Sequence, residues 1–436
     1  MSKIIKSERE ILEKLGIKAL NKMQVEAKKL IQQKHDTLLL SPTGTGKTLA
    51  FLLPIMSDLN PDLQEVQALI ITPTRELAMQ IETVAREMGT GLKINVVYGG
   101  RFISKDKDDL RTPSGLLIGT PGRLVDHFKR GTFSLESIKY LVLDEFDKSL
   151  EIGFEKQMKD ILFQLKHLKV KVLTSATHGV EIPDFVQVPK LKYADYLEDG
   201  LSSLEILRIS SPSKDKLNTL GDTLKRLEGL PGIVFCNFKS SISRVSAYLS
   251  DNGIAHGCFY GGMEQKDRER ALIKFRNGTH RILLATDLAA RGIDVPEIKY
   301  IIHYHLPLKK EEFTHRNGRT ARMNAEGSAY VILWEKEEAP EFIGTLKEAT
   351  FDDNHSSNSV RWITLLISGG RKDKISKGDI AGLFLKKGQL QKHELGVIEL
   401  KQDCAFVSVP KNKSKQVIKL LDNQRIKKRK VRIRAI

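Results

Sequence analysis

The stretch SPTGTGKT at residues 41–48 has the residue types of a phosphate-binding loop, and it directly follows the apolar run TLLL at 37–40. Glycines in such a loop let backbone N–H groups close around phosphate oxygens, and the lysine supplies a positive charge for the β- and γ-phosphates. The hydroxyl of the last residue can bind Mg²⁺. The strict pattern starts with glycine where this chain has serine, so the first position is relaxed. The motif predicts a nucleotide site built from Ser41, Thr43, Gly44, Thr45, Gly46, Lys47 and Thr48.

Hydrolysis also needs acidic groups, and YLVLDEFD at 140–147 places them directly after an apolar run. Asp144 can hold Mg²⁺ through water, and Glu145 can orient or deprotonate the attacking water. An exposed acidic turn is the alternative, but the preceding apolar residues favour a site at the end of a buried strand. Phe146 adds a bulky ring beside the acidic pair, and overpacking typically costs ~1–3 kcal/mol unless neighbouring residues shrink. We therefore predict a working site with a repacked wall.

Arginines that could neutralise a transferring phosphoryl group lie in HRNGRTARMNAEG at 315–327. Arg316, Arg319 and Arg322 recur with a period of three, which on a helix places them close to one face. Alone, this pattern is more typical of a solvated basic face. Together with an upstream phosphate-binding loop it favours arginine fingers.

The elements that must position these groups alternate short apolar runs with amphipathic stretches over the first 350 residues. Such runs indicate buried parallel strands of an α/β fold. A Ser- and Pro-containing break, ISSPSKDK at 209–216, separates two series of runs, and a polar stretch at 348–360 resembles a linker. We expect an α/β lobe at 1–208, a second at 209–350, a linker at 351–360 and a further domain at 361–436.

The last 76 residues have a different pattern, with predicted strands at 362–368, 395–401, 404–410 and 430–436 and helices at 377–387 and 412–423. The order β-α-β-β-α-β is that of an RNA-recognition module, a small α+β fold. Residues 361–436 hold 20 Lys and Arg against 6 Asp and Glu, a net of +14 in a chain whose total is +17. A compact basic module indicates nucleic acid as partner, because neutralising phosphates releases counterions.

The composition excludes several other classes. Apolar residues make up 40% of the chain, and no run approaches the ~18 residues of a membrane span. The charged N-terminus MSKIIKSERE lacks the apolar core of a secretory signal, so we expect a cytoplasmic protein. Cys236, Cys258 and Cys404 are too far apart for a metal-ligand spacing or a disulfide framework.

Over roughly residues 1–350 the sequence resembles a DEAD-box RNA helicase, with two RecA-like lobes. The motifs stand in family order: Gln24 in GIKALNKMQ, SPTGTGKT (41–48), PTRELA (73–78), GG (99–100), TPGR (120–123), DEFD (144–147), SAT (175–177), IVFCNFK (233–239), QKDR (265–268), ATDLAARGIDVP (285–296) and HRNGRTAR (315–322). The resemblance implies that Gln24 reads adenine, Asp294 contacts the ribose, and Arg319 and Arg322 act as fingers on the γ-phosphate. It implies that Ser175, Thr177, Asp147 and His315 couple hydrolysis to lobe closure.

The same resemblance implies RNA-backbone contacts, which give little sequence preference. On the first lobe these are Thr74, Arg75, Gly100, Thr120 and Arg123, and on the second Asn237, Arg268, Thr286 and Arg291. The tail resembles the C-terminal RNA-binding domain of the bacterial DbpA/YxiN group, which implies a grip on large-subunit ribosomal RNA and a role in ribosome assembly. This tail has few aromatic residues at the usual stacking positions, so we predict recognition by a basic cluster. The candidates are Arg371, Lys372, Lys374, Lys427, Lys428, Arg429, Lys430, Arg432 and Arg434.

We therefore predict an RNA-stimulated ATP hydrolase that uses ATP and Mg²⁺ to unwind or remodel short RNA duplexes, working as a monomer and not on DNA. A nucleotide-gated RNA clamp with little turnover is one alternative, motivated by Phe146 and by Leu20-Asn21, which replace the usual Pro-Thr of the adenine-reading segment. A general RNA helicase for cold adaptation or RNA decay is the other.

Overall fold

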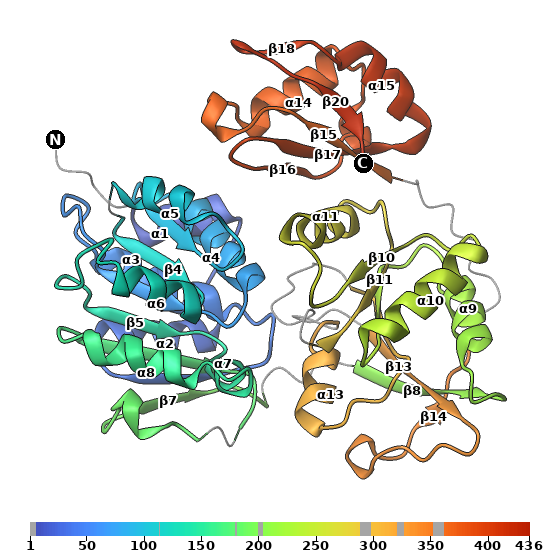
Figure 1. Cartoon of the computed structure of the whole chain (residues 1–436), viewed down its shortest axis with the longest axis horizontal. Helices are drawn as coiled ribbons and strands as arrows, with labels where there is room; N and C mark the ends of the chain where they lie inside the picture. The colour runs from blue at the N-terminus through green and yellow to red at the C-terminus, as the bar shows by residue number, and fades with distance from the viewer. Residues whose placement is uncertain are drawn as a thin grey trace. The chain divides into compact units, whose positions relative to one another are not determined.

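The computed structural model describes residues 6–112, 114–178, 181–198, 204–287, 298–320, 327–351 and 362–436 (Figure 1). Two seven-stranded parallel sheets and a four-stranded antiparallel sheet organise these residues. The chain divides into two compact units, of which the first contains one parallel sheet and the second contains the other two sheets. The expected linker at 351–360 lies, apart from Phe351, outside the described residues.

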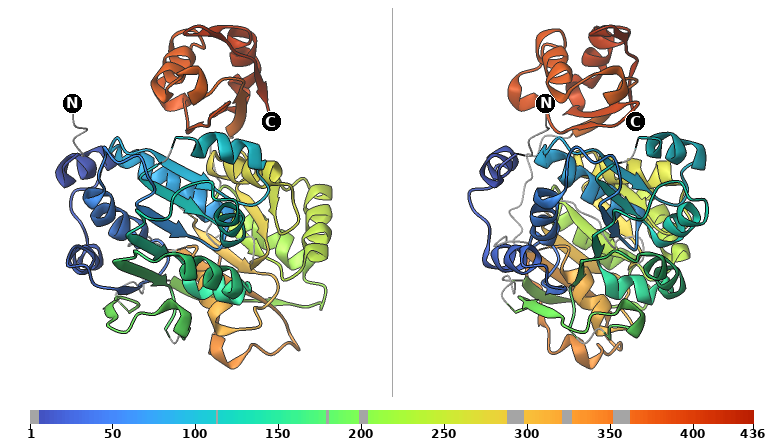
Figure 2. Two further views of the ribbon diagram at one scale, coloured as in Figure 1. Left: turned by 60° about the vertical axis from the view of Figure 1, so that its left-hand side comes forward. Right: turned by 90° about the vertical axis from the view of Figure 1, so that its left-hand side faces the viewer.

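The first parallel sheet runs in the order β3 (Ile94–Val97), β4 (Leu116–Gly119), β2 (Ala68–Ile71), β5 (Tyr140–Leu143), β6 (Val170–Ser175), β1 (Thr37–Leu40) and β7 (Lys192–Asp195). Helices cover both of its faces (Figure 2). One layer is α1 (Glu8–Leu15), α2 (Lys22–Gln32), α3 (Lys47–Asp58) and α4 (Arg75–Met88). The other is α5 (Ile103–Leu110), α6 (Pro121–Lys129), α7 (Phe146–Glu151) and α8 (Glu155–Gln164).

The short apolar runs of the sequence are explained by this double cover. Successive side chains of a strand point to opposite faces. Ala68 and Ile70 of β2 lie in the core under the first helical layer, and Leu69 and Ile71 lie in the core under the second. Because both faces are buried, most positions of the inner strands are apolar.

The second parallel sheet runs β10 (His256–Phe259), β11 (Ile282–Ala285), β9 (Gly232–Phe235), β12 (Tyr300–His303), β13 (Gly327–Trp334), β8 (Leu204–Ser211) and β14 (Lys347–Glu348). Its described helices include α9 (Leu217–Arg226), α10 (Lys239–Asp251), α11 (Gln265–Arg276) and α13 (Lys310–Asn317). β8 pairs with β13 along its whole length, so this sheet begins at Leu204. The predicted boundary after residue 208 therefore falls inside a strand, which was missed because LEILRISS alternates apolar and polar residues next to a Ser/Pro break.

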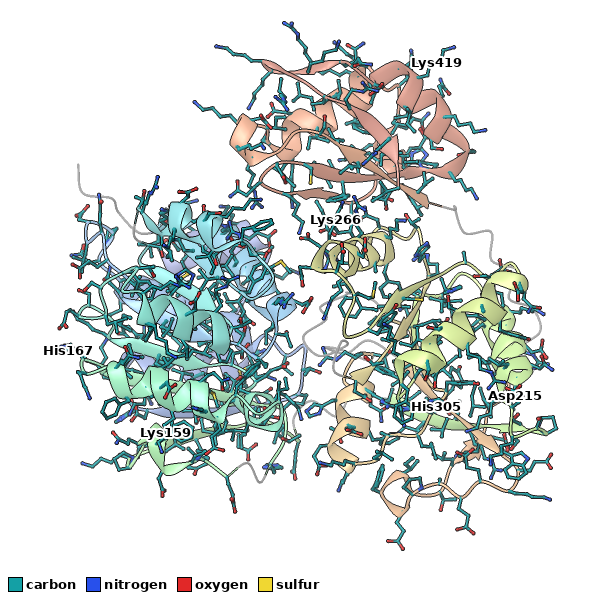
Figure 3. All side chains as sticks on the ribbon, viewed as in Figure 1. Lys159, His167, Asp215, Lys266, His305 and Lys419 are labelled. Carbon is teal, nitrogen blue, oxygen red and sulfur yellow. The ribbon has the colours of Figure 1, made fainter. Side chains whose placement is uncertain are left out.

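The antiparallel sheet of the C-terminal domain has the order β16 (Ile398–Leu400), β17 (Ala405–Pro410), β15 (Trp362–Ile367) and β20 (Ile433–Ala435). With α14 (Lys377–Lys386) and α15 (Ser414–Leu421), the predicted β-α-β-β-α-β order is confirmed. A small hairpin, β18 (Arg425–Ile426) and β19 (Arg429–Lys430), is inserted before the last strand. Long nitrogen-tipped side chains project from this domain, Lys419 of α15 among them (Figure 3).

No helix in the described ranges has both the length and the apolar character needed to cross a membrane.

Candidate functional site

The phosphate-binding loop connects β1 to α3, and its backbone takes a conformation that glycine adopts most easily. Gly44 and Gly46 have φ angles of +86° and +90°, in the left-handed region. α3 begins at Lys47, so the N–H groups of its first turn and the positive end of the helix dipole face the loop. The Lys47 ammonium donates to the carbonyl oxygens of Ser41 and Pro42. A bound phosphate would offer this ammonium a charged acceptor in place of these neutral ones.

The predicted adenine reader, Gln24, is tied to the phosphate-binding loop. It is the third residue of α2, and it forms a capping box with Asn21: Gln24 N donates to Asn21 Oδ1 at 2.9 Å, and Asn21 N donates to Gln24 Oε1 at 3.0 Å. The side-chain amides of both residues also donate to loop carbonyls, Gln24 to Gly46 at 3.2 Å and Asn21 to Thr45 at 3.0 Å. Asn21, which departs from the family's usual threonine, thus keeps the capping function and fastens α2 to the loop.

The acidic pair stands at the end of β5, where Thr174 of β6 holds both residues. Thr174 Oγ1 donates to Asp144 Oδ1 at 2.6 Å and accepts from the backbone N–H of Glu145 at 3.0 Å. Glu145 has a φ of +47°, a strained conformation for a residue with a side chain. Thr174 was not a predicted site residue, and the only sign of it in the sequence is a polar residue inside the apolar run KVLTS.

Asp144 and the hydroxyl of Thr48 fit a Mg²⁺ site. Burial and the neighbouring charge of Glu145 raise the pKa of Asp144 from its ordinary 3.8 to about 6, because the ionised carboxylate loses its hydration and faces a like charge. A hard divalent cation would stabilise the ionised form, and carboxylate and hydroxyl oxygens are the ligands that Mg²⁺ prefers. Asp144 and Thr48, the second residue of α3, would hold it, and it would neutralise phosphate charge there.

Phe146 is fully buried in an apolar core. It is the first residue of α7 and belongs to the core between the first sheet and the α5–α8 layer, together with Leu143 and Leu173. The bulky ring therefore fills volume in the core, in agreement with the repacked wall that the sequence predicts. The polar contacts of Asp144 and Glu145 through Thr174 are formed with this ring in place.

Three of the four predicted coupling residues meet on the first lobe. Ser175 Oγ donates to the Thr177 carbonyl and accepts from the Thr177 N–H, both at 3.1 Å, and Thr177 Oγ1 lies 3.4 Å from Asp147 Oδ2. The backbone carbonyl of Ser175 accepts from Ser41 N at 3.2 Å, which links this turn to the phosphate-binding loop. The fourth residue, His315, lies on α13 of the second lobe.

Arg316 and Arg319 do not lie on one helix, which corrects the prediction that these arginines share a helix face. Arg316 is buried and makes a bidentate pair with Asp287, both distances being 2.6 Å, and it also donates to His305 O and Asn237 Oδ1. α13 ends at Asn317, so Arg319 follows the helix in a turn, where its Nε donates to His315 O at 3.3 Å. Arg322 lies outside the described residues, as do Arg291 and Asp294.

The predicted RNA-contact residues of the first lobe gather at the carboxyl ends of β2, β3 and β4. Thr74 caps α4 by accepting from Leu77 N at 3.3 Å, and Arg75 opens that helix. Gly100 has a φ of +84°, which strains any residue with a side chain, and a Cβ there would stand 2.5 Å from Arg75 Nη1, so the Arg75 side chain would have to move. Thr120 occupies the capping position of α6.

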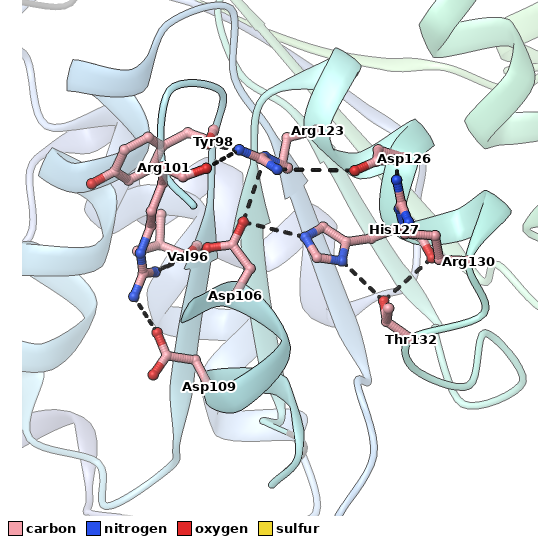
Figure 4. A network of polar contacts seen from close by, with 10 residues as sticks. All are labelled: Val96, Tyr98, Arg101, Asp106, Asp109, Arg123, Asp126, His127, Arg130 and Thr132. Carbon is pink, nitrogen blue, oxygen red and sulfur yellow. Dashed lines mark hydrogen bonds and ion pairs between the residues drawn. The ribbon is translucent and has the colours of Figure 1, made fainter. Parts of the chain in front are cut away.

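Arg123 holds the loop that contains Gly100. Its Nε donates to the Tyr98 carbonyl at 3.2 Å and its Nη2 donates to the Arg101 carbonyl (Figure 4). Only 9% of the Arg123 side chain is exposed. The contacts thus assign Arg123 a loop-holding role in addition to the RNA contact that the sequence predicts.

A fully buried carboxylate, Asp106 of α5, stands at the centre of this network (Figure 4). It lies 3.5 Å from Arg123 Nε, 3.3 Å from Arg101 Nη1 and 3.3 Å from Nε2 of the buried His127. Arg101 also pairs with Asp109 at 2.5 Å. Sequence reasoning missed Arg101, Asp106 and His127, because an acidic residue in the charged stretch SKDKDDL gives no sign of burial.

The described RNA-contact candidates of the second lobe are fixed by their neighbours. Asn237 Nδ2 donates to Leu306 O at 2.9 Å, and the Arg268 guanidinium lies over the Phe259 ring at 4.7 Å. Thr286 N donates to Phe259 O at 3.3 Å. Asn237 and Thr286 follow β9 and β11, which are adjacent strands of the second sheet.

In the C-terminal domain, two distant segments form one basic surface. Lys427 Nζ donates to the Lys374 carbonyl at 2.6 Å, and Arg429 lies 3.8 Å from Asp373. These contacts bring the β18–β19 hairpin beside the turn that follows β15. The exposed members of this basic cluster are Arg371, Lys372, Lys374, Lys427, Lys428, Arg429 and Lys430. Two further exposed arginines follow the cluster in the sequence, Arg432 and Arg434. Arg432 pairs with Asp422 at 3.2 Å.

Comparison with protein families gives three matches along the chain. The DEAD/DEAH box helicase family matches residues 21–185, the helicase conserved C-terminal domain matches 215–324, and the DbpA RNA binding domain matches 364–435. Among curated proteins, the ATP-dependent RNA helicase DbpA of Bacillus subtilis is 31% identical over 460 residues, covering 97% of this chain and 96% of that protein. The DbpA of Escherichia coli is 30% identical over 439 residues, covering 98% and 96%.

Solved structures agree with this assignment. The structure of Saccharomyces cerevisiae Dbp5 bound to RNA and ADP BeF3 matches with a TM-score of 0.66 and 27% identity, covering 75% of this chain and 88% of that one. The DEAD-box helicase Mss116 bound to ssRNA and UDP-BeF matches with a TM-score of 0.67 and 25% identity, covering 76% and 74%.

Proposed function

The chain belongs to the DEAD-box ATP-dependent RNA helicases of the DbpA type, and we propose that it remodels short RNA duplexes in large-subunit ribosomal RNA during ribosome assembly. The observation that carries the ribosomal part is the basic cluster of the C-terminal domain, which belongs to the DbpA RNA binding domain. We propose further that the protein works in the cytoplasm as a monomer, with RNA rather than DNA as its substrate.

In this proposal the first lobe binds and hydrolyses ATP with Mg²⁺ at Thr48 and Asp144. Lys47 and the N–H groups at the start of α3 bind the phosphates. Glu145, whose backbone is fixed by Thr174, orients the attacking water. Arg319 and Arg322 of the second lobe would neutralise the charge that develops on the γ-phosphate. Asp294 and Gln24 would contact the nucleoside, and Ser175, Thr177, Asp147 and His315 would couple hydrolysis to lobe movement.

RNA would be held at two kinds of surface. The lobes would contact the backbone of any RNA through Thr74, Arg75, Gly100, Thr120, Arg123, Asn237, Arg268, Thr286 and Arg291. The basic cluster, with Arg432, would add affinity for one structured RNA, because several cations fixed on one surface can match a particular arrangement of phosphates. The cluster thus brings the lobes to a chosen RNA, and the lobes remodel what lies beside it.

The test is steady-state ATP hydrolysis without RNA, with ribosomal RNA and with a generic duplex, using Glu145→Gln as the inactive control. Strong stimulation by ribosomal RNA alone supports the whole proposal. Equal stimulation by both RNAs retains the helicase and favours the general role in cold adaptation or RNA decay. Hydrolysis at the level of Glu145→Gln with every RNA would favour a nucleotide-gated clamp.

A second comparison isolates the basic cluster in the full-length chain. Replacing the exposed residues Arg371, Lys372 and Lys428 by alanine removes three candidate phosphate contacts without touching the domain core. The matched control replaces Lys411, Lys415 and Lys419, which are exposed in or just before α15 and lie outside the cluster. We expect the cluster variant to lose the preference for ribosomal RNA. The slope of log binding constant against log salt concentration should also become shallower by roughly two. Equal behaviour of the two variants would contradict tethering through this cluster.

A further inference from the structure

Two phenylalanine rings are exposed directly beside predicted RNA-contact residues, one on each lobe. Phe102 is 78% exposed and follows Gly99-Gly100 and Arg101, and Phe238 is 64% exposed and follows Asn237. Each occupies the capping position of a helix, Phe102 before α5 and Phe238 before α10. Since these helices follow β3 and β9, both rings stand at the carboxyl edge of a parallel sheet, where the predicted RNA contacts also lie.

The backbone that carries Phe102 is held from several sides. The carbonyl before it, that of Arg101, accepts from Arg123 Nη2, and its own carbonyl accepts from Lys105 N at 3.1 Å. The Arg101 side chain is anchored to Asp106 and Asp109 beneath the loop. These contacts hold in place the backbone from which the exposed ring projects.

Phe238 has a comparable support. The side chain of the preceding Asn237 donates to Leu306 O at 2.9 Å and accepts from the buried Arg316 at 2.8 Å. The carbonyl of Phe238 accepts from Ile242 N at 3.2 Å, which starts α10. The next residue, Lys239, places its ammonium over the Tyr260 ring at 5.4 Å, so a positive charge lies next to the exposed ring in sequence.

Scattered exposed apolar residues are normal on proteins, so the location of these rings must carry the argument. Phe163 is a useful contrast, because it is equally exposed, at 74%. It lies at the end of α8, which leads into the start of β6 and therefore lies at the opposite, amino edge of the sheet. Its ring carries the Lys166 ammonium at 4.2 Å. Within the described residues, Phe102 and Phe238 have no such ring or cation partner.

We propose that Phe102 and Phe238 stack on bases or riboses of single-stranded RNA that the lobes hold by its backbone, an inference that rests on the proposed function. Contacts to phosphates fix the path of an RNA strand but leave its bases exposed to water. An aromatic side chain that is held beside the strand can stack on one of these bases. Predicted backbone contacts stand just before both rings, Gly100 two residues before Phe102 and Asn237 one residue before Phe238, so a strand bound at these contacts would lie near the rings. Stacking tolerates every base, because each has a π-face.

The experiment uses the full-length protein and measures RNA-stimulated ATP hydrolysis as a function of the concentration of a duplex with a single-stranded tail. Phe102→Ala and Phe238→Ala are each expected to raise the RNA concentration for half-maximal stimulation about 5-fold or more, since one stacked base contributes ~1–3 kcal/mol. The rate without RNA and the rate at saturating RNA should stay within about twofold. Phe163→Ala is the matched control and should leave all three values unchanged.

A conservative series separates stacking from simple apolar contact. Phe102→Trp should restore RNA affinity and Phe102→Leu should not. The wild-type chain has two tryptophans, both in the second unit, so Phe102→Trp also adds the first tryptophan of the first lobe. Its fluorescence should be quenched by the single-stranded tail, beyond any change in the wild-type protein.

The outcomes are distinguishable from failure of the proposed function. If wild-type hydrolysis responds to RNA while Phe102→Ala and Phe238→Ala match Phe163→Ala, the stacking proposal is wrong and the helicase stands. If Phe102→Leu restores affinity as well as Phe102→Trp does, the ring makes no stacking contact and the proposal is also wrong. If wild-type hydrolysis does not respond to any RNA, both the proposed function and this inference fall.

Discussion

Replacement of Phe146 by alanine tests whether the bulky residue in the DEFD motif blocks chemistry or fills a core. The ring is fully buried among Leu143, Leu173 and other residues between the first sheet and the α5–α8 layer. Removing a buried phenylalanine typically costs ~3–5 kcal/mol, because apolar contacts are lost and a cavity is left behind. In a lobe of about 200 residues each kcal/mol lowers the melting temperature by ~2–4 °C. The expected fall in the melting temperature of the first lobe is therefore about 6–20 °C.

The catalytic rate should respond much less. Asp144 and Glu145 are held by hydrogen bonds to Thr174, which belongs to the neighbouring strand β6, and Phe146 makes neither of these bonds. We expect RNA-stimulated turnover at 15–20 °C, below the lowered transition, to stay within roughly threefold of wild type. Phe146→Met, which nearly conserves volume, should lose less than ~1.5 kcal/mol of stability and serves as the control.

The assay combines thermal unfolding with ATP hydrolysis on the same samples. A chain with several domains does not unfold in one transition, so the transition of the first lobe is identified by its shift with a non-hydrolysable ATP analogue. The reasoning is refuted if Phe146→Ala hydrolyses ATP tenfold faster than wild type while its first-lobe transition moves by less than 2 °C. That result would mean that the wild-type ring obstructs the site, as the clamp alternative requires.

Two further predictions concern buried charge. Asp106→Asn removes the buried charge that faces Arg101 and Arg123, so the Gly99–Gly100 loop should loosen and the RNA concentration for half-maximal ATPase stimulation should rise several-fold, with a smaller change in turnover. Asp109→Asn, at the exposed end of the network, should have a weaker effect. Equal effects of the two substitutions would contradict a central role for Asp106. Burial and the nearby charge of Arg316 lower the pKa of His303 from 6.5 to about 3, so the native protein keeps this ring neutral while the unfolded chain takes up a proton below about pH 6.5. Stability should therefore be constant above pH 6.5 with respect to this group and fall, by at most ~1.4 kcal/mol per pH unit, as the pH drops from 6.5 towards 3. His303→Gln should flatten that part of the pH profile in urea unfolding, and an unchanged profile would show that the ring titrates normally.

Most inner strands could be predicted from the sequence because both of their faces are buried, which makes most of their positions apolar. The edge strand β3 is also fully buried and apolar, but the edge strands β7 and β14 could not be predicted. β7 buries only Ala194 of its four residues, and β14 consists of two exposed residues, so neither carries an apolar signal. β8 was missed for the related reason that it alternates. The α+β pattern of the C-terminal domain was readable because its sheet packs helices on one face and its elements are separated by polar turns.

The site divides in the same way between motif residues and their supports. The candidate ligand-binding residues carry distinctive types at fixed spacing, so the sequence alone can propose them. Their supports are ordinary residues whose role depends on burial: Thr174 between the acidic residues, Asn21 at the start of α2, and Asp106 under the glycine loop. Arg316 shows the opposite error, in which a support residue resembles a ligand-binding one. Its spacing matches that of the candidate fingers, but its guanidinium forms a bidentate ion pair with Asp287 inside the lobe. The period of three cannot distinguish a buried structural arginine from a candidate finger, because the helix that the period assumes ends between Arg316 and Arg319.

The strand order of the first sheet explains how one lobe can serve nucleotide and RNA together. β1, β5 and β6 are grouped on one side and lead into the candidate nucleotide residues, while β2, β3 and β4 are grouped on the other and lead into the candidate RNA-contact residues. The two groups meet where β5 pairs with β2, and there Asp144 N donates to the Ile71 carbonyl at 2.9 Å. The strands on both sides of this junction are fully buried, so the sheet itself has little freedom to move. A response to nucleotide must therefore pass through the loops at the carboxyl edge and the side chains that hold them. Thr174, near the end of β6, and Asp106 of α5 are such supports, so their substitution should uncouple RNA binding from hydrolysis.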